Sequence, residues 1–236
     1  PNNIRLELMN MKFYEGTGYV FDAVCAMHFA MNKRASLLNL SWGFYRERIP
    51  YILYQAMRRA YEEDVLIVTS SGNDNLDNDT HTRWPANSPF ENVVTVGAAA
   101  VIPPDTVLTS YTNYGEQTVD LFANGYFNTL APPNGSTTVA GTSLSAPFVA
   151  RTASIIRARY PGLSAADVRL CLLKSVRVLP ALAGTSLTEG MLYEPGALQC
   201  ADALANPLST AAVQLQGKVI ERTVQLSWQI YQELPI

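Results

Sequence analysis

The strongest constraint on the fold is a short run of β-branched and aliphatic residues, Val65-Leu66-Ile67-Val68-Thr69. A strand that is apolar at nearly every position is typical of a parallel sheet covered on both faces. Segments with a helical spacing of apolar residues lie at 49–63 and 143–160. Strands that alternate with helices in this way predict a layered α/β fold with a mainly parallel sheet.

The remaining elements follow from the same periodicities. We expect further strands at 4–13, 35–42, 92–96, 107–111, 119–122 and 129–131, and further helices from 19, at 163–176 and at 197–204. The first of these helices carries an apolar stripe that we expect to face the core, made of Phe21, Val24, Cys25, His28 and Phe29. The helix over 143–160 presents small residues, which favour close packing on the sheet: Ala146, Val149, Ala150 and Ala153.

The pattern changes after residue 206. Two strands are predicted at 211–220 and 223–231, and in the second one apolar residues alternate with polar residues from Val224 to Ile230. Because two strands alone are marginal in water, we expect them to open a β-sandwich-like module. The predicted domains are therefore 1–206 and 207–236, with the second continuing beyond Ile236.

Composition excludes several classes of protein. Hydrophobic residues make up 48% of the 236 residues and charged residues 16%, which excludes intrinsic disorder. The net charge is −3 and no Lys/Arg-rich run exists, so nucleic-acid binding is not indicated. No apolar stretch approaches the roughly 18 residues that a membrane-spanning helix needs.

The three cysteines do not form a CxxC pair, so a structural zinc site is not indicated. Cys25 and Cys171 lie on predicted apolar helix faces, and we interpret them as small buried hydrophobes. One disulfide with one free thiol stays open as an alternative, so cysteine usage does not fix the redox compartment.

The segment Gly141-Thr-Ser-Leu-Ser-Ala-Pro147 carries the clearest chemical signal. It places Ser143 in the first turn of a long helix, where unpaired N–H groups and the helix dipole favour negative charge. A serine in that position can attack a carbonyl while its own N–H holds the oxyanion. The Gly-x-Ser-x-Gly elbow of α/β-hydrolases does not fit, because Ser145 replaces its second glycine and no histidine follows Ser143.

Two polar segments follow predicted strands. Ser70-Ser71-Gly72-Asn73-Asp74 follows the buried strand, and Leu40-Ser41-Trp42-Gly43 ends the strand before it. Because the carboxyl ends of parallel strands meet at one edge of a sheet, both segments point at the same crevice. An asparagine amide on such a turn can serve as a donor there.

Together these segments closely resemble the subtilisin-like serine peptidases, over roughly residues 4–205. The motifs 141–147, 70–74 and 40–43 match the nucleophile, oxyanion and substrate-binding motifs of that family, and 84–86, 93–97, 108–115 and 119–125 match its connecting segments. The resemblance implies a three-layer subtilisin-like fold, incomplete at its N-terminus. It implies a serine endopeptidase that forms an acyl-enzyme, with Ser143 as nucleophile and Asn73 in the oxyanion hole. The implied substrate-binding residues are Ser41, Trp42, Gly43, Ser70, Ser71, Gly72 and Thr142.

The sequence offers no clear general base for Ser143. In the family an aspartate and a histidine precede the strand matched by 4–13, whereas this chain has only His28, on the helical stripe, and His81, in a polar loop. Neither suits the role, so we expect this chain alone to be inactive and to be a fragment of a longer peptidase. The alternative is a catalytically inactive relative that binds peptides in the same cleft.

The resemblance also bears on cofactors, partners and location. The chemistry requires no cofactor, although the oxygen-rich loop from Asp74 to Asp79 leaves room for a structural calcium ion. The implied partner is a peptide or protein substrate, which the backbones of Ser41–Gly43 and Ser70–Gly72 would bind as an added strand. The family resemblance implies a secreted or cell-surface protein.

Overall fold

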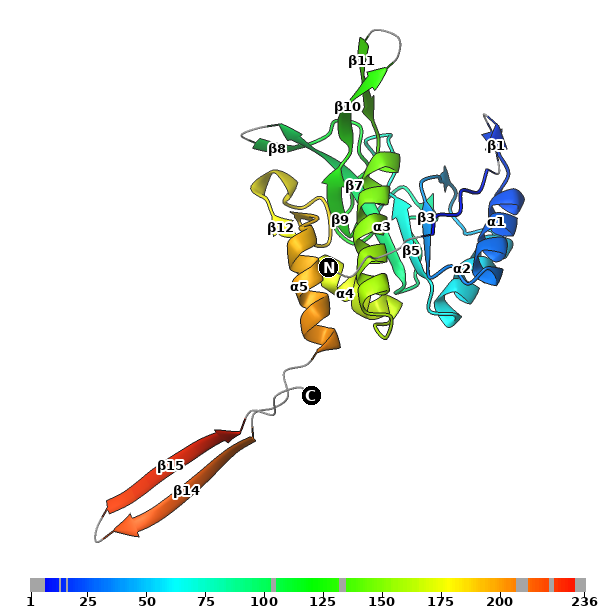
Figure 1. Cartoon of the computed structure of the whole chain (residues 1–236). Helices are drawn as coiled ribbons and strands as arrows, with labels where there is room; N and C mark the ends of the chain where they lie inside the picture. The colour runs from blue at the N-terminus through cyan, green and yellow to red at the C-terminus, as the bar shows by residue number, and fades with distance from the viewer. Residues whose placement is uncertain are drawn as a thin grey trace.

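The computed structural model describes residues 7–12, 14–15, 17–102, 105–131, 135–206, 212–220 and 223–231, and its centre is a seven-stranded sheet (Figure 1). The strand order is β12 (Arg177–Val178), β13 (Gly190–Met191), β9 (Leu121–Asn124), β7 (Val93–Ile102), β5 (Leu66–Ser70) and β3 (Leu37–Leu40), with β8 (Asp105–Leu108) on β7. The pairs β3–β5, β5–β7, β7–β9 and β9–β13 are parallel, while β7–β8 and β12–β13 are antiparallel. The predicted mainly parallel sheet is confirmed.

Helices cover both faces of this sheet (Figure 1). On one face lie α1 (Val20–Asn32) and α2 (Tyr51–Glu62), and on the other α3 (Thr142–Arg159), α4 (Ala165–Lys174) and α5 (Glu194–Ala205). Successive side chains of β5 point to opposite faces of the sheet: Ile67 packs into the α1–α2 core, whereas Leu66 and Val68 pack into the α3–α5 core. This arrangement confirms the three-layer α/β fold.

The small residues of α3 pack as the sequence predicts. Ala146, Val149 and Ala153 are fully buried, and α3 contacts β3, β5, β7 and β9. Small side chains bring this helix close to the sheet, so α3 can present its first turn at the carboxyl edge of the strands.

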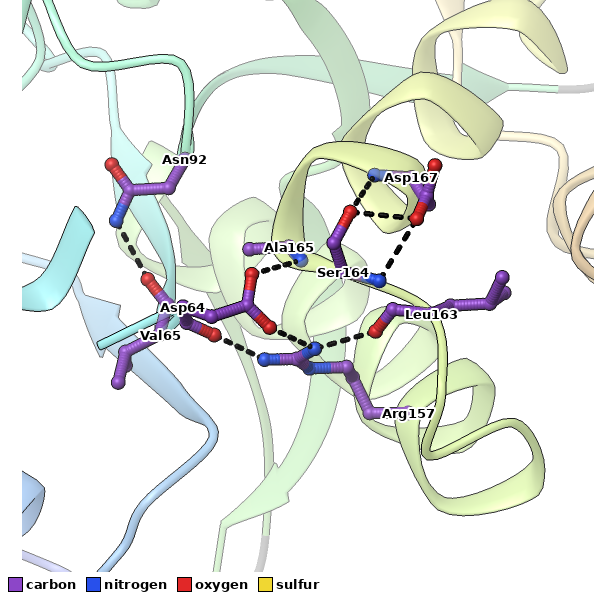
Figure 2. A network of polar contacts seen from close by, with 8 residues as sticks. All are labelled: Asp64, Val65, Asn92, Arg157, Leu163, Ser164, Ala165 and Asp167. Atoms are coloured by element: carbon purple, nitrogen blue, oxygen red, sulfur yellow. Dashed lines mark hydrogen bonds and ion pairs between the residues drawn. The ribbon is translucent and has the colours of Figure 1, made fainter. Parts of the chain in front are cut away.

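A polar network fixes the other end of α3 (Figure 2). Nη1 of Arg157 donates to Oδ2 of Asp64 at 2.8 Å and to the Leu163 carbonyl at 2.7 Å, while Oδ1 of Asp64 accepts from the N–H of Ala165 at 2.7 Å. Ser164 and Asp167 form a capping box at the start of α4. The network thus joins the turn before β5 to the end of α3 and the start of α4.

The predicted apolar stripe of α1 is wrong for most of its members. Phe21 and Phe29 are 63% and 47% exposed and Cys25 is exposed, whereas the buried side chains are Ala23, Val24, Met27, Ala30 and Met31. Both faces of this helix are apolar, so periodicity alone does not choose between them. The face with small and flexible side chains packs more closely against α2 and β3.

The strand predicted at 4–13 is also not found, because residues 7–12 form no regular structure and residues 1–6 and 13 lie outside the described part. A strand needs a neighbouring backbone for its hydrogen bonds, and none pairs with 7–12 among the described residues. Short elements that sequence did not predict are the strands β12 and β13, β1 (Tyr14–Glu15), β2 (Thr17–Gly18), β4 (Phe44–Tyr45), β6 (Arg83–Trp84), β11 (Gly135–Ala140) and the 3₁₀ turn η1 (Pro180–Leu182). β11 pairs with β10 (Tyr126–Ala131), and β4 pairs with β6, which follows His81.

At the C-terminal end, β14 (Ala212–Ile220) and β15 (Thr223–Tyr231) form an antiparallel hairpin, as the sequence predicts. The division into domains at 206 and 207, and the sandwich-like nature of the second one, stay predictions. None of the helices within the described residues combines the length and apolarity that a membrane crossing requires.

Cys171 is not a free buried hydrophobe, because it forms a disulfide with Cys200 that joins α4 to α5. Cys25 is the exposed free thiol. The structure therefore corrects our interpretation of Cys25 and Cys171 and realises the alternative of one disulfide and one thiol. Sequence could not identify the pair, since 29 positions separate two helices that only the fold brings together.

Candidate active site

Three segments meet at the carboxyl edge of the sheet. Ser41 follows β3, Gly72 and Asn73 follow β5, and Thr142 and Ser143 form the first turn of α3. The two strands are parallel neighbours, with Leu40 opposite Thr69. The fold thereby gathers the predicted site residues from positions up to 102 residues apart.

Contacts with Thr142 set the orientation of the Asn73 side chain. Its Oδ1 atom accepts from the N–H of Thr142 at 2.8 Å and from the Thr142 hydroxyl at 2.9 Å. Because Oδ1 accepts both of these hydrogen bonds, the Nδ2 amide of Asn73 lies on the side away from Thr142 and remains available as a donor. A Cβ built on Gly141 would lie 3.4 Å from that Nδ2 and 3.1 Å from the Ser143 Oγ, so both groups border the same small space.

Pro147 and Ser41 hold the backbone of Ser143. Proline has no N–H, so Pro147 cannot make the helical hydrogen bond to the carbonyl four residues earlier, which is that of Ser143. The Ser41 hydroxyl donates to this carbonyl instead, at 3.1 Å. This contact ties the end of β3 to the candidate nucleophile, and Ser143 itself is half-buried.

We call the segments 41–43 and 70–72 the cleft segments, and the backbone of 70–72 makes several hydrogen bonds within the protein. In 70–72 the Ser70 and Ser71 carbonyls accept from Arg83 and Asn78, while Gly72 donates to the Thr142 hydroxyl and accepts from the N–H of Asn113. The Ser70 and Ser71 carbonyls and both polar backbone groups of Gly72 therefore already have partners within the protein. Gly72 has φ +121°, a conformation that favours glycine.

Trp42 is half-buried, and its ring lies nearly parallel to that of Phe44 with centroids 6.4 Å apart. Ser71 is fully buried, and its hydroxyl donates to the Asn113 carbonyl at 3.0 Å. Packing and side-chain hydrogen bonds thus hold these two residues of the cleft segments in place.

Sequence reasoning missed two residues at this site, Asn113 and Arg83. Fully buried Asn113 accepts from the N–H groups of Asp74 and Leu76 and donates to the Tyr45 hydroxyl at 2.7 Å, so it holds the loop that carries Asn73. The only signal in the sequence is an asparagine within the segment Tyr-Thr-Asn-Tyr-Gly, and its burial is seen only in the structure. Arg83 lies beneath the cleft, and burial lowers its pKa.

Neither histidine lies in a position to activate Ser143. Nδ1 of His28 lies 2.9 Å from Nη1 of Arg59, and because arginine has only donors, this nitrogen accepts. Nδ1 of His81 lies 2.9 Å from the Thr80 hydroxyl and 3.2 Å from the Asp77 carbonyl. His28 is only half-buried, which corrects the prediction of a packed core histidine, while His81 is exposed as expected.

Protein donors already bind the acidic side chains of the 74–79 loop. Asp79 accepts from the Thr118 hydroxyl at 2.6 Å and from the N–H of Gln117, and Asp77 Oδ1 accepts from the N–H of Asp79. Across the described ranges, no group of three or more His, Cys, Asp or Glu residues is arranged to hold a metal ion. A structural calcium ion stays a prediction.

Comparison with known proteins identifies the family of this chain. A family model described as the Subtilase family matches residues 3–199. Subtilisin DY from Bacillus licheniformis is 28% identical over 170 residues, which are 71% of this chain and 59% of the relative. Alkaline protease 1 from Emericella nidulans is 32% identical over 166 residues, 69% of this chain and 38% of the relative. Subtilisin-like protease 2 from Plasmodium falciparum is 27% identical over 158 residues, 64% of this chain and 11% of the relative.

Solved structures agree on the fold. A chain from the subtilase cytotoxin SubAB has a TM-score of 0.69 at 21% identity, covering 80% of this chain and 67% of its own. The prenylagaramide maturation protease PagA has a TM-score of 0.66 at 22% identity, covering 78% and 68%. The chain spans between 11% and 59% of the length of the three relatives above. Because the family model matches most of the chain, the chain belongs to the subtilase family.

Proposed function

We propose that the protein that carries this chain is a serine endopeptidase in which Ser143 forms an acyl-enzyme. The observation that supports this most directly is the fixed orientation of Asn73, whose Oδ1 is held by Thr142 while its Nδ2 borders the same space as the Ser143 Oγ. A donor that is oriented before the substrate arrives stabilises a developing oxyanion without reorganisation.

In the proposed mechanism the Ser143 Oγ attacks the carbonyl carbon and its proton passes to a base. The carbonyl oxygen becomes an oxyanion that accepts hydrogen bonds from the Asn73 Nδ2 and from the N–H of Ser143, which lies in the unpaired first turn of α3. The C–N bond then breaks, the amine leaves with a proton, and water hydrolyses the acyl-enzyme. All of these groups belong to protein or substrate, so the proposed chemistry requires no cofactor.

The base is proposed to come from residues outside these 236, because Arg59 engages His28 and the Asp77–Thr80 turn engages His81. This engagement also favours a second candidate function, a catalytically inactive relative that binds peptides in the same cleft. The sequence upstream of residue 1 in the parent gene distinguishes the peptidase from the inactive relative in part, because the peptidase requires an aspartate motif and a histidine motif there.

Fluorophosphonate labelling of the full-length protein tests the proposal directly. We expect covalent labelling that is lost in Ser143→Ala. The Asn73→Asp variant keeps the shape but loses the donor, and we expect turnover to fall about 100- to 1,000-fold, as on removal of an oxyanion donor from subtilisin. A folded full-length protein that does not label would refute the peptidase and leave the peptide binder.

We further propose that the protein works outside the cell or at the cell surface. The Cys171–Cys200 disulfide supports this location, since such bonds persist mainly in oxidising compartments. Its substrates would be peptides or proteins that can lie extended along the cleft segments.

A further inference from the structure

The Arg83 side chain lies at the base of a gap between the two cleft segments. A Cβ built on Gly43 would lie 2.4 Å from the Cζ and Nη1 atoms of Arg83 and 2.6 Å from its Nη2. A Cβ built on Gly72 would lie 2.9 Å from its Cδ and Nε. Side chains do not approach so closely, so the guanidinium takes the space that residues 43 and 72 would otherwise fill.

The positive charge of Arg83 has little local compensation. Arg83 is 8% exposed; its Nη1 donates to the Ser70 carbonyl at 2.8 Å, and within the described part of the chain no carboxylate lies within 4.0 Å of it. Asp74 acts on Arg83 electrostatically, but its carboxylate accepts from the Tyr45 hydroxyl at 2.6 Å. A buried guanidinium has five donors and a cost of desolvation, so this one is suited to an anionic partner.

The position of Asn73 determines which part of a peptide lies above Arg83. Asn73 directly follows Gly72, so a carbonyl held by its Nδ2 places its own residue next to that glycine. The side chain of that residue then enters the gap between Gly43 and Gly72, whose floor is the guanidinium. A long apolar side chain would meet a charge there, whereas a carboxylate would meet N–H donors.

We infer that Arg83 selects peptides in which glutamate or aspartate contributes the carbonyl of the scissile bond. The side-chain carboxylate accepts charge-assisted hydrogen bonds from the guanidinium, which are stronger than neutral ones in a site shielded from water. This inference takes the orientation of the peptide from the proposed function and names the substrate class of the same site.

The test is a set of internally quenched peptides that differ only at that position, carrying Glu, Gln, Ala, Phe or Lys, with the full-length protein. Glu is expected to exceed Gln by about 10- to 100-fold in kcat/KM, the range that one or two charged hydrogen bonds provide. Arg83→Gln should abolish this difference and Arg83→Lys should retain its direction. Arg46→Gln, which removes an exposed charge next to β4, should leave it unchanged.

A second measurement separates this inference from the peptidase proposal. Fluorescence anisotropy with Ser143→Ala protein reports binding of labelled versions of the same peptides without any turnover. If nothing is cleaved but the Glu peptide binds best and Arg83→Gln removes that preference, the peptidase proposal fails and the inference stands. If peptides are cleaved or bound with Glu equal to Gln, or with Ala preferred because the gap only excludes size, the inference is overturned.

Discussion

Removal of the Cys171–Cys200 disulfide should destabilise the protein by a predictable amount. The bond closes a segment of 29 residues between α4 and α5. By the loop-closure relation, a cross-link of this span lowers the entropy of the unfolded chain by an amount equivalent to ~3.5 kcal/mol at 25 °C. Cys171 is fully buried in the α3–α5 core, so the variant Cys171→Ala/Cys200→Ala also loses a small amount of packing.

Urea unfolding followed by tryptophan fluorescence measures this effect. With a urea dependence of about 1–3 kcal/mol per molar, the midpoint should fall by roughly 1–3 M. All proteins in the comparison carry Cys25→Ser, which removes the exposed thiol and prevents disulfide exchange. That change alone should shift stability by no more than about 0.5 kcal/mol, as expected for an exposed position.

Two results would refute the reasoning. One is a double-alanine variant whose midpoint equals that of the Cys25→Ser control. The other is a thiol titration that finds Cys171 and Cys200 reactive in the unreduced, unfolded Cys25→Ser protein, since the bond would then not exist.

Three further perturbations test the packing and the site. Asp64→Ala should lower the free energy of unfolding by about 1–2 kcal/mol, because it leaves the nearly buried Arg157 without its anion; this value is already reduced for the half-exposed carboxylate. Asp64→Asn should lower it less, and equal decreases in urea unfolding would contradict the network. Asp167→Asn should lose about 1 kcal/mol at pH 7. Hydrogen bonds from the hydroxyl and N–H of Ser164 lower the pKa of Asp167, so its contribution is present above the unfolded value of about 3.9 and is lost as pH falls through the lower folded value. Variant and parent should therefore converge in acid, and a constant difference down to pH 2 would show that the cap is not ionic. Asn113→Ala removes the acceptor for the loop that carries Asn73, so fluorophosphonate labelling at an intact Ser143 should slow about tenfold or more, and an unchanged rate would exclude this positioning role.

Sequence predicted the elements whose signal is local. The run at 65–69 identified a strand covered on both faces, since continuous apolarity records burial directly. The small inner face of α3 was also predicted, because it depends on residues within about two helical turns. The motif order located the three segments of the candidate site.

The sequence did not decide cases in which one apolar pattern fits two structures. Helix α1 has apolar residues on both faces. Packing against the core buries Met27 and Met31, whereas the Phe21 and Phe29 side chains are exposed to solvent. The apolar run before this helix did not become a strand in its described part, since a strand requires a partner that no local pattern specifies.

The amino-acid sequence by itself determined the fold class and the segments that carry Ser143 and Asn73, because those depend on periodicity and on short motifs. Only the tertiary structure decided that Cys171 pairs with Cys200, that Asn113 holds the loop that carries Asn73, and that Arg83 lies between Gly43 and Gly72. These contacts join residues 11 to 40 positions apart, and their distances follow from how the layers pack. Local sequence fixes which groups are available, whereas packing fixes which of them meet.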